Sequence, residues 1–306
     1  MKAVNSILVV VDRSPASADA VAKAVLLARQ FKARVELFMC DAERGYALTQ
    51  AYIPKGVEEA RQACIVEVYR HLEALKKSAA APDVSIATDA GCESPLYESI
   101  VRKVLRVRPD LVIKSVAGTP SRLDATDWQL MRTCPATLML TRGRLWQSPS
   151  RFAAAVDSSG AESAGLARDI LQAAQLLTGC VGGGLDVLYA EPVDMRDDDR
   201  ESGNRALYDL VSKFPDTTPE VHVLVGTPEV SLPSFAKRRS YDAMLLGALT
   251  HRPGVTAQVG SLTSRLLEAL ECDFILVKPS AYSCPVGESY GRPAARSTAS
   301  AIEESL

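Results

Sequence analysis

The chain has 306 residues, which predicts two domains at about 150 residues per domain. Hydrophobic residues make up 47% of the chain and charged residues 24%, so wholesale disorder is excluded. Lys and Arg number 35 against 37 Asp and Glu, a formal net charge of -2. Because this leaves no basic excess to neutralise phosphates, sequence-independent binding to nucleic acid is disfavoured.

Neither a membrane span nor a disulfide framework is predicted. The first apolar run, residues 7–11, is too short for a signal-peptide core, and no stretch approaches the length that spans a bilayer. We therefore expect a soluble cytoplasmic protein without a membrane partner. The 7 cysteines are widely spread and contain no C-x-x-C pair, so we interpret most of them as small buried hydrophobes.

Short apolar runs alternate with amphipathic segments through the first half. Strands are predicted near residues 6–11, 34–39, 83–88, 109–114 and 136–140. Helices are predicted near 15–32, 55–78, 94–106 and 124–133. This alternation favours an α/β fold with a mostly parallel sheet.

The second half shows the same alternation. Its strands are predicted near residues 152–156, 185–190, 220–225, 242–247 and 273–277. Its first helix places an apolar stripe on one face: Leu166, Ile170, Ala173 and Leu177. Residues 141–151 are predicted as a linker, and residues 280–306, which have no periodicity, as a loose C-terminal tail.

The two halves are related by an internal repeat. Each begins with an apolar run that ends in Val-Asp-x-Ser, at Asp12 and at Asp157. The agreement continues at a constant spacing through the following helix, and Cys134 and Cys272 precede the last strand of each half. We therefore expect two copies of one domain, at residues 1–143 and 150–279.

Asp12 and Asp157 end the first strand of each copy. In an open parallel sheet, ligands bind beside the carboxyl ends of the strands, where a carboxylate can accept hydrogen bonds from a ribose or an amino group. An Asp at this position also commonly caps the helix that follows. The two roles are compatible, and the sequence leaves both open.

The segment from Gly247 to Ser261 runs from the end of a strand to the start of a helix. Gly247 would allow close approach of a ligand, and Gly260-Ser261 would offer backbone N–H groups and a hydroxyl to a phosphate. Taken alone this is a weak signal, because Gly and Ser also form ordinary loops and caps. His251 and Arg252 could contact phosphates or simply be solvated loop residues.

A family resemblance follows from the order of these motifs. A strand ending in Asp-x-Ser, a late strand ending in Gly and a G-x2-G-x9-G-[ST] pattern resemble the universal stress protein family. The duplication and the stretches Thr126-Asp127-Trp128 and Arg132-Thr133-Cys134-Pro135 resemble its tandem-domain (UspE-like) members. The resemblance covers about residues 5–279.

This resemblance implies two tandem doubly wound domains, each a five-strand parallel sheet in the order 3-2-1-4-5 flanked by helices. It implies ATP or a related adenine nucleotide in the second domain, with Mg²⁺ if the ligand is ATP. Asp157 would contact the nucleoside and Ala190 would lie near adenine, while Gly247, Gly260 and Ser261 would line the phosphate path. The two domains would pair as an internal pseudo-dimer, and a homodimer is a further possibility.

The sequence departs from the family pattern in both halves. Thr250 stands where the second glycine of the motif is expected, and its Cβ could block the approach of a ligand. In the first half Ser115 replaces the first glycine, Gly118 remains, and no Gly-Ser pair opens the last helix. That half is therefore not expected to hold ATP in the way that ATP-binding members of the family do.

Other candidate residues have a structural interpretation beside a functional one. His71 and His222 lack acidic or sulfur partners at ligand spacing in the sequence, so no metal site is predicted. Asp197-Asp198-Asp199 is interpreted as favouring a helix N-terminus. Trp128 is interpreted as a core residue, although with Met131 it could line an apolar first pocket.

No catalytic motif is present, so we expect a binding protein rather than an enzyme, with weak ATP hydrolysis left open. The leading hypothesis is a regulatory or protective stress-response protein that binds a nucleotide or another small ligand, with protein partners also possible. One alternative is an ATP-independent interaction module with vestigial or lipid-binding pockets. The other is a weak ATPase.

Overall fold

The computed structural model describes residues 3–50, 56–116, 122–157, 161–214, 218–250, 258–280 and 282–287. The first half contains the strands β1 (Ser6–Val10), β2 (Arg34–Cys40), β3 (Ile86–Gly91), β4 (Leu111–Ser115) and β5 (Thr137–Thr141). Its helices are α1 (Ala16–Phe31), α2 (Ala42–Gln50), α3 (Val57–Ser78), α4 (Leu96–Val107) and α5 (Ala125–Thr133). Helix α2 was not predicted, because Gly45 is its one buried residue and no apolar stripe marks it.

The second half contains the strands β6 (Ser150–Ala155), β7 (Gly183–Glu191), β8 (Glu220–Val225), β9 (Ala243–Gly247) and β12 (Asp273–Val277). Its helices are α6 (Ala161–Val181), α7 (Asp197–Val211), α8 (Pro228–Arg239) and α9 (Ser261–Ala269). Two short strands, β10 (Leu249–Thr250) and β11 (Gln258–Val259), pair as a hairpin that the sequence did not predict. None of the described helices is long and apolar enough to cross a membrane.

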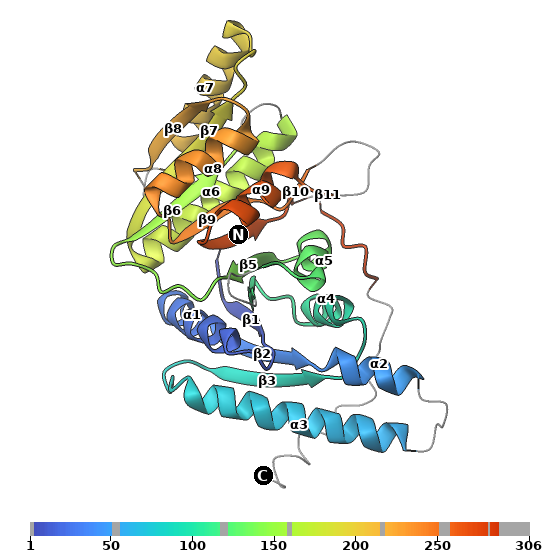
Figure 1. Cartoon of the computed structure of the whole chain (residues 1–306). Coiled ribbons are helices and arrows are strands. Elements are labelled where there is room, and N and C mark those ends of the chain that lie inside the picture. Colours follow the sequence, from blue (N-terminus) through green and yellow to red (C-terminus); the bar gives the residue numbers. More distant parts are fainter. Residues whose placement is uncertain are drawn as a thin grey trace.

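The large strands form one continuous sheet in the order β3-β2-β1-β4-β5-β12-β9-β6-β7-β8 (Figure 1). Counted within each half, both five-strand segments have the order 3-2-1-4-5, as the resemblance implies. Within this sheet the strands of each half are parallel, whereas β5 and β12 pair antiparallel, with Met139 opposite Ile275. The α/β fold class is confirmed, and the domain boundaries at residues 143, 150 and 279 stay a prediction.

Helices cover both faces of the sheet, and alternate side chains of each strand point to opposite faces. Val9 belongs to an apolar cluster that includes residues of α1, α3 and α6, and Val10 to one that includes residues of α4, α5, α8 and α9. Each cluster contains residues from both halves. The apolar core therefore runs through the junction rather than ending at it.

In each half, an acidic residue just before the fourth strand accepts hydrogen bonds from backbone N–H groups near the start of the first strand. The Asp110 carboxylate accepts a hydrogen bond from the N–H of Ser6 at 3.0 Å, and Ser6 corresponds to Arg151 in the second half. The Asp242 carboxylate accepts from the N–H groups of Gln147 at 2.9 Å and Arg151 at 2.8 Å. The same contact thus recurs at corresponding positions of the two halves.

A buried carboxylate holds the junction between the halves. Asp273, at the start of β12, is only 1% exposed. It accepts hydrogen bonds from the N–H of Arg142 at 2.8 Å, from the Trp146 indole N–H at 2.7 Å and from the ammonium of Lys23 on α1. One side chain of the second half therefore binds both the connecting segment and a helix of the first half.

The segment that follows β12 packs against the C-terminal end of α5. Lys278, Tyr282 and Cys284 donate side-chain hydrogen bonds to the carbonyls of Met131, Arg132 and Thr133, respectively. Carbonyl groups in the last turn of a helix have no partner within it, so these donors satisfy them. The segment expected as a loose tail therefore begins with packed residues, and its continuation from residue 288 lies outside the described residues.

Replacing the junction carboxylate is expected to destabilise the whole chain. Asp273→Ala leaves the ammonium of Lys23 and the indole N–H of Trp146 buried without their acceptor. Breaking a buried ion pair in this way typically lowers the free energy of unfolding by about 3–5 kcal/mol. Urea denaturation measures the change. In the control Asp83→Ala, which removes an exposed carboxylate paired with Arg29, the loss should be far smaller; equal losses in the two variants would contradict the assignment.

The stability contribution of Lys278 is expected to depend on pH. Burial lowers its pKa from 10.5 to about 8, so between these values the unfolded chain binds more protons than the folded chain. The contribution of Lys278 to the free energy of unfolding therefore rises with pH through this window. Urea denaturation of the wild type and Lys278→Met at several pH values tests this. We expect the difference between them to shift in favour of the wild type above about pH 8, and a difference independent of pH would contradict it.

Candidate functional site

Three of the predicted site residues lie at the carboxyl ends of adjacent strands. The strands β9, β6 and β7 are neighbours in the sheet, and Gly247 ends β9, Asp157 follows β6 and Ala190 lies near the end of β7. Asp157 is exposed, whereas Ala190 is buried. The fold thus brings these residues to one edge of the sheet, the edge at which ligands bind in doubly wound folds.

Gly247 is approached closely by a side chain of this chain. A Cβ at this position would lie 2.6 Å from Cδ2 of Leu166 on α6, so a larger residue would force Leu166 to move. The carbonyl of Gly247 accepts a hydrogen bond from the Thr263 hydroxyl at 2.9 Å. This bond ties the end of β9 to α9 and so positions the N-terminus of that helix at the same edge.

Thr250 lies in the hairpin between β9 and α9. Its backbone pairs with Gln258, and Leu249 pairs with Val259. The intervening residues 251–257, which include His251 and Arg252, lie outside the described residues. The hairpin therefore brings the chain back to α9 across the long spacing of the glycine motif. That His251 and Arg252 contact phosphates stays a prediction.

At the start of α9, the side chain of Ser261 contacts a carboxylate that was not predicted. Gly260 is the N-cap residue and has no side chain to cap the helix. The Ser261 hydroxyl donates a hydrogen bond to Glu229 Oε1 at 2.7 Å. This bond and the backbone N–H of Glu229 hold the pKa of that carboxyl below its usual value. The hydroxyl expected to face a phosphate thus faces a negative charge of the chain.

At the corresponding edge of the first half, Asp12 serves the turn before α1. Its carboxylate accepts hydrogen bonds from the Ser14 N–H and the Ser17 hydroxyl, both at 2.8 Å. Burial by itself raises the pKa of Asp12, but these hydrogen bonds and the charge of Lys114 leave it lower than usual. The structural interpretation of Asp12 is therefore the one that its contacts support.

A buried ion pair lies beneath α5 in the first half. The Lys114 ammonium donates to Asp127 Oδ1 at 2.7 Å, and the Asp127 side chain is completely buried. Burial raises the pKa of Asp127, while the charge of Lys114 acts in the opposite direction. Asp127 also forms a reciprocal capping box with Asp124.

Part of the first-half motif Thr126-Asp127-Trp128 therefore has a structural role, since Asp127 forms the buried ion pair. Met131 is completely buried in the apolar cluster of α4, α5, α8 and α9, and Trp128 packs against that cluster. The prediction that Trp128 is a core residue is therefore supported. The same packing gives the apolar-ligand interpretation of these two residues no support within the described part of the chain.

Another group of titratable residues lies at the opposite edge of the second half. Ligand atoms of Asp186, Glu220 and His222 lie within 4.8 Å of one another. The fold therefore supplies acidic partners for His222 that the sequence spacing did not reveal. The guanidinium of Arg239 lies 3.9 Å from Asp186 and 3.4 Å from Glu220, and the Tyr241 hydroxyl donates to Asp186 at 2.6 Å. Arg151, whose guanidinium lies 3.9 Å from Asp186, and Arg239 together balance the charges of the two carboxylates, so the group does not support a metal site.

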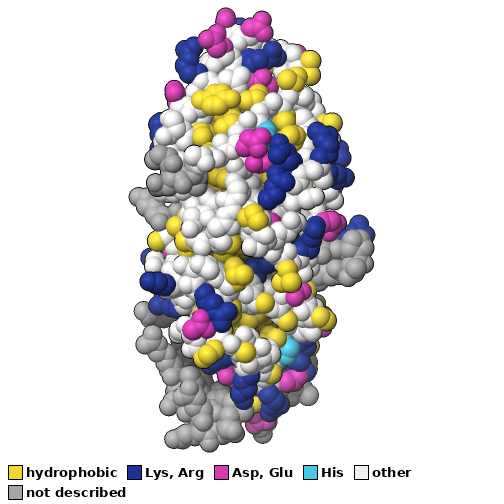
Figure 2. Space-filling view, turned by 90° about the vertical axis from the view of Figure 1, so that its left-hand side faces the viewer, with side chains coloured by type: hydrophobic (Ala, Val, Ile, Leu, Met, Phe, Trp, Pro, Cys, Tyr) yellow, Lys and Arg dark blue, Asp and Glu magenta, His cyan; other side chains and the backbone are white. Residues whose placement is uncertain are grey.

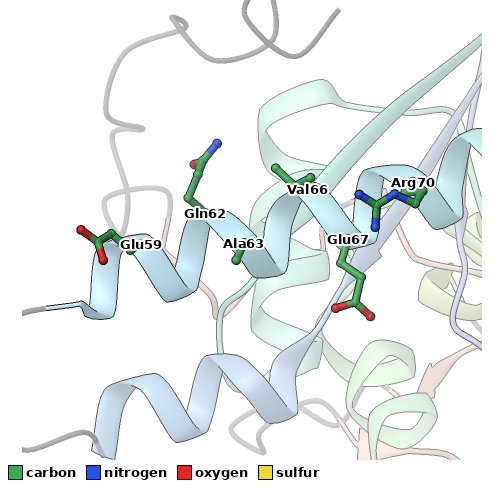
Figure 3. Close-up of a pocket in the computed structure, with 6 residues that line it drawn as sticks. All are labelled: Glu59, Gln62, Ala63, Val66, Glu67 and Arg70. Carbon is green, nitrogen blue, oxygen red and sulfur yellow. The ribbon is translucent and has the colours of Figure 1, made fainter. Parts of the chain in front are cut away.

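The surface offers two further features. A groove of about 590 Å³ runs along α3, where Glu59, Gln62, Ala63, Val66, Glu67 and Arg70 line it (Figure 3). All six come from a single helix, and none is a predicted site residue. On the face seen in Figure 2, acidic and basic side chains are interspersed, in keeping with the net charge of -2.

Sequence reasoning missed Lys114 and Glu229, for different reasons. A lysine inside the apolar strand at residues 111–115 was a visible signal of a buried partner, because a lysine is almost never fully buried unless it is paired. Glu229 gave no such signal, since an acid in the first turn of a helix is ordinary. Only the packing of α8 against α9 brings it to Ser261.

Comparisons with known proteins agree with this fold. Residues 4–142 match the sequence model of the Universal stress protein family. Universal stress protein E of Salmonella typhi is 24% identical over 305 residues, which cover 92% of this chain and 96% of that protein. The universal stress protein E homolog of Haemophilus influenzae is also 24% identical, over a match that covers 90% of this chain and 98% of that protein.

Solved structures show the same fold. A Pseudomonas aeruginosa UCBPP-PA14 structure has a TM-score of 0.70 at 21% identity and covers 91% of this chain and 94% of its own. A universal stress protein from Archaeoglobus fulgidus DSM 4304 has a TM-score of 0.63 at 14% identity, over a match that covers 90% of this chain and 96% of that chain. The first half of the chain thus matches the universal stress protein family model, and the chain is similar to universal stress protein E over most of its length.

Proposed function

We propose that this protein is a cytoplasmic stress-response protein with a regulatory or protective role, whose second half binds an adenine nucleoside or nucleotide. The observation that carries the proposal is the gathering of Asp157, Ala190 and Gly247 at the carboxyl ends of neighbouring strands. An exposed carboxylate there can accept hydrogen bonds from the hydroxyls of a ribose.

The nucleoside part of such a ligand fits this edge better than its phosphates. Asp157 is exposed to solvent, so a ribose can reach it. By contrast, Leu166 packs on Gly247, and the Ser261 hydroxyl is hydrogen-bonded to Glu229. If the ligand were ATP, its Mg²⁺ would neutralise phosphate charge, and we assign no residue of this chain to the ion.

We further propose that the two halves, residues 1–143 and 150–279, are copies of one domain and that only the second binds the ligand. The shared strand order and the recurring Asp110 and Asp242 contacts support duplication. In the first half the Asp12 carboxylate is used within its own turn. The two alternatives, an ATP-independent interaction module and a weak ATPase, are supported by no particular contact among the described residues.

Replacing the two pseudo-equivalent aspartates tests this asymmetry. Asp157→Ala is expected to weaken adenosine binding by about tenfold to a hundredfold, because a hydrogen bond to a charged group contributes about 1.5–3 kcal/mol. The matched Asp12→Ala is expected to lower stability but leave the affinity unchanged. Isothermal titration calorimetry of each variant with adenosine measures the effect. No heat from the wild type at millimolar adenosine, or equal losses in both variants, would contradict the proposal.

A further inference from the structure

The N-terminus of α9 is arranged to attract a negative charge that its own sequence does not provide. Its N-cap residue, Gly260, has no side chain, and no acidic residue lies in its first turn. The first N–H groups of a helix lack partners within it, and the helix dipole places a partial positive charge there. An anion from elsewhere is therefore favoured at this point.

Glu229 supplies that anion from the neighbouring helix. Its Oε1 accepts a hydrogen bond from the Ser261 hydroxyl at 2.7 Å, across the packed pair α8 and α9. Glu229 also lies in the first turn of α8, so its carboxylate is near the positive ends of two helices. The hydrogen bond from Ser261 lowers the pKa of Glu229, and the charge of Arg265 acts in the same direction. The group is accordingly ionised at neutral pH.

We propose that Glu229 occupies the anion position at the start of α9 and excludes phosphate-bearing ligands from it. A phosphate placed to accept a hydrogen bond from Ser261 would lie beside the Glu229 carboxylate, and like charges at this separation repel. It would also compete for the one proton that the Ser261 hydroxyl can donate. This inference rests on the proposed function and deepens it, because it names uncharged adenine nucleosides, rather than nucleoside triphosphates, as the ligand class of the second half.

The contacts of Gly247 also disfavour a phosphate at this place. The carbonyl of Gly247 is held by Thr263, and its Cα faces the side chain of Leu166. Gly247 thus has an apolar side chain beside it, and Ser261 has a carboxylate beside it. Neither is a favourable neighbour for a phosphate, which needs N–H or cationic donors.

The experiment compares three full-length proteins: the wild type, Glu229→Gln and Glu268→Gln. Gln at 229 can still accept the hydrogen bond from Ser261, so this variant removes the charge and keeps an acceptor. Glu268 is an exposed residue near the other end of α9, so its replacement changes the net charge equally but away from the N-terminus. Calorimetric titrations at low ionic strength use two separate probes, inorganic pyrophosphate and adenosine.

We expect Glu229→Gln to bind pyrophosphate at least tenfold more tightly than the wild type and Glu268→Gln do, and all three to bind adenosine equally. Pyrophosphate affinities of Glu229→Gln and Glu268→Gln that agree within twofold would overturn the role of Glu229, whatever adenosine does. If the pyrophosphate result is as expected but adenosine binds to none of the three, the role of Glu229 stands and the proposed nucleoside site fails. The two probes therefore separate the two claims.

Discussion

The buried carboxylate of Asp273 holds the junction on which the arrangement of the whole molecule depends. It binds α1 through Lys23 and the connecting segment through Arg142 and Trp146, at the point where β12 pairs with β5. Because that pairing is antiparallel, the strands of the two halves run in opposite directions. The carboxyl ends of the first-half strands and those of the second-half strands therefore lie at opposite edges of one continuous sheet (Figure 1).

This separation allows the two edges to differ. In the first half, the carboxylate of Asp12 is used by its own turn, and the Lys114–Asp127 pair is buried under α5. In the second half, Asp157 is exposed, and Ser261 at the start of the neighbouring helix α9 donates its hydroxyl hydrogen bond to Glu229. Asp12 is thus half-buried and Asp157 is exposed, and this difference in exposure supports the proposed function.

The sequence predicts the strands well, because each is a short apolar run bounded by polar residues. It also predicts which residues end those strands, so the gathering of Asp157, Ala190 and Gly247 at one edge could be foreseen. Helix α2 could not, since it has no apolar stripe, and the β10–β11 hairpin could not, since its strands have only two residues each. The contact between Ser261 and Glu229 depends on how two helices pack, and no local pattern records such a contact.

We propose that the edge of the second half, and not that of the first, accepts a nucleoside. The most direct measurement is an NMR titration of the full chain with adenosine, following the backbone amide signals. We expect shifts at Asp157, Ala190 and Gly247, with the amide signals of Asp12, Ser14 and Lys114 unchanged. Shifts of equal size at both edges, or shifts confined to the first half, would contradict it.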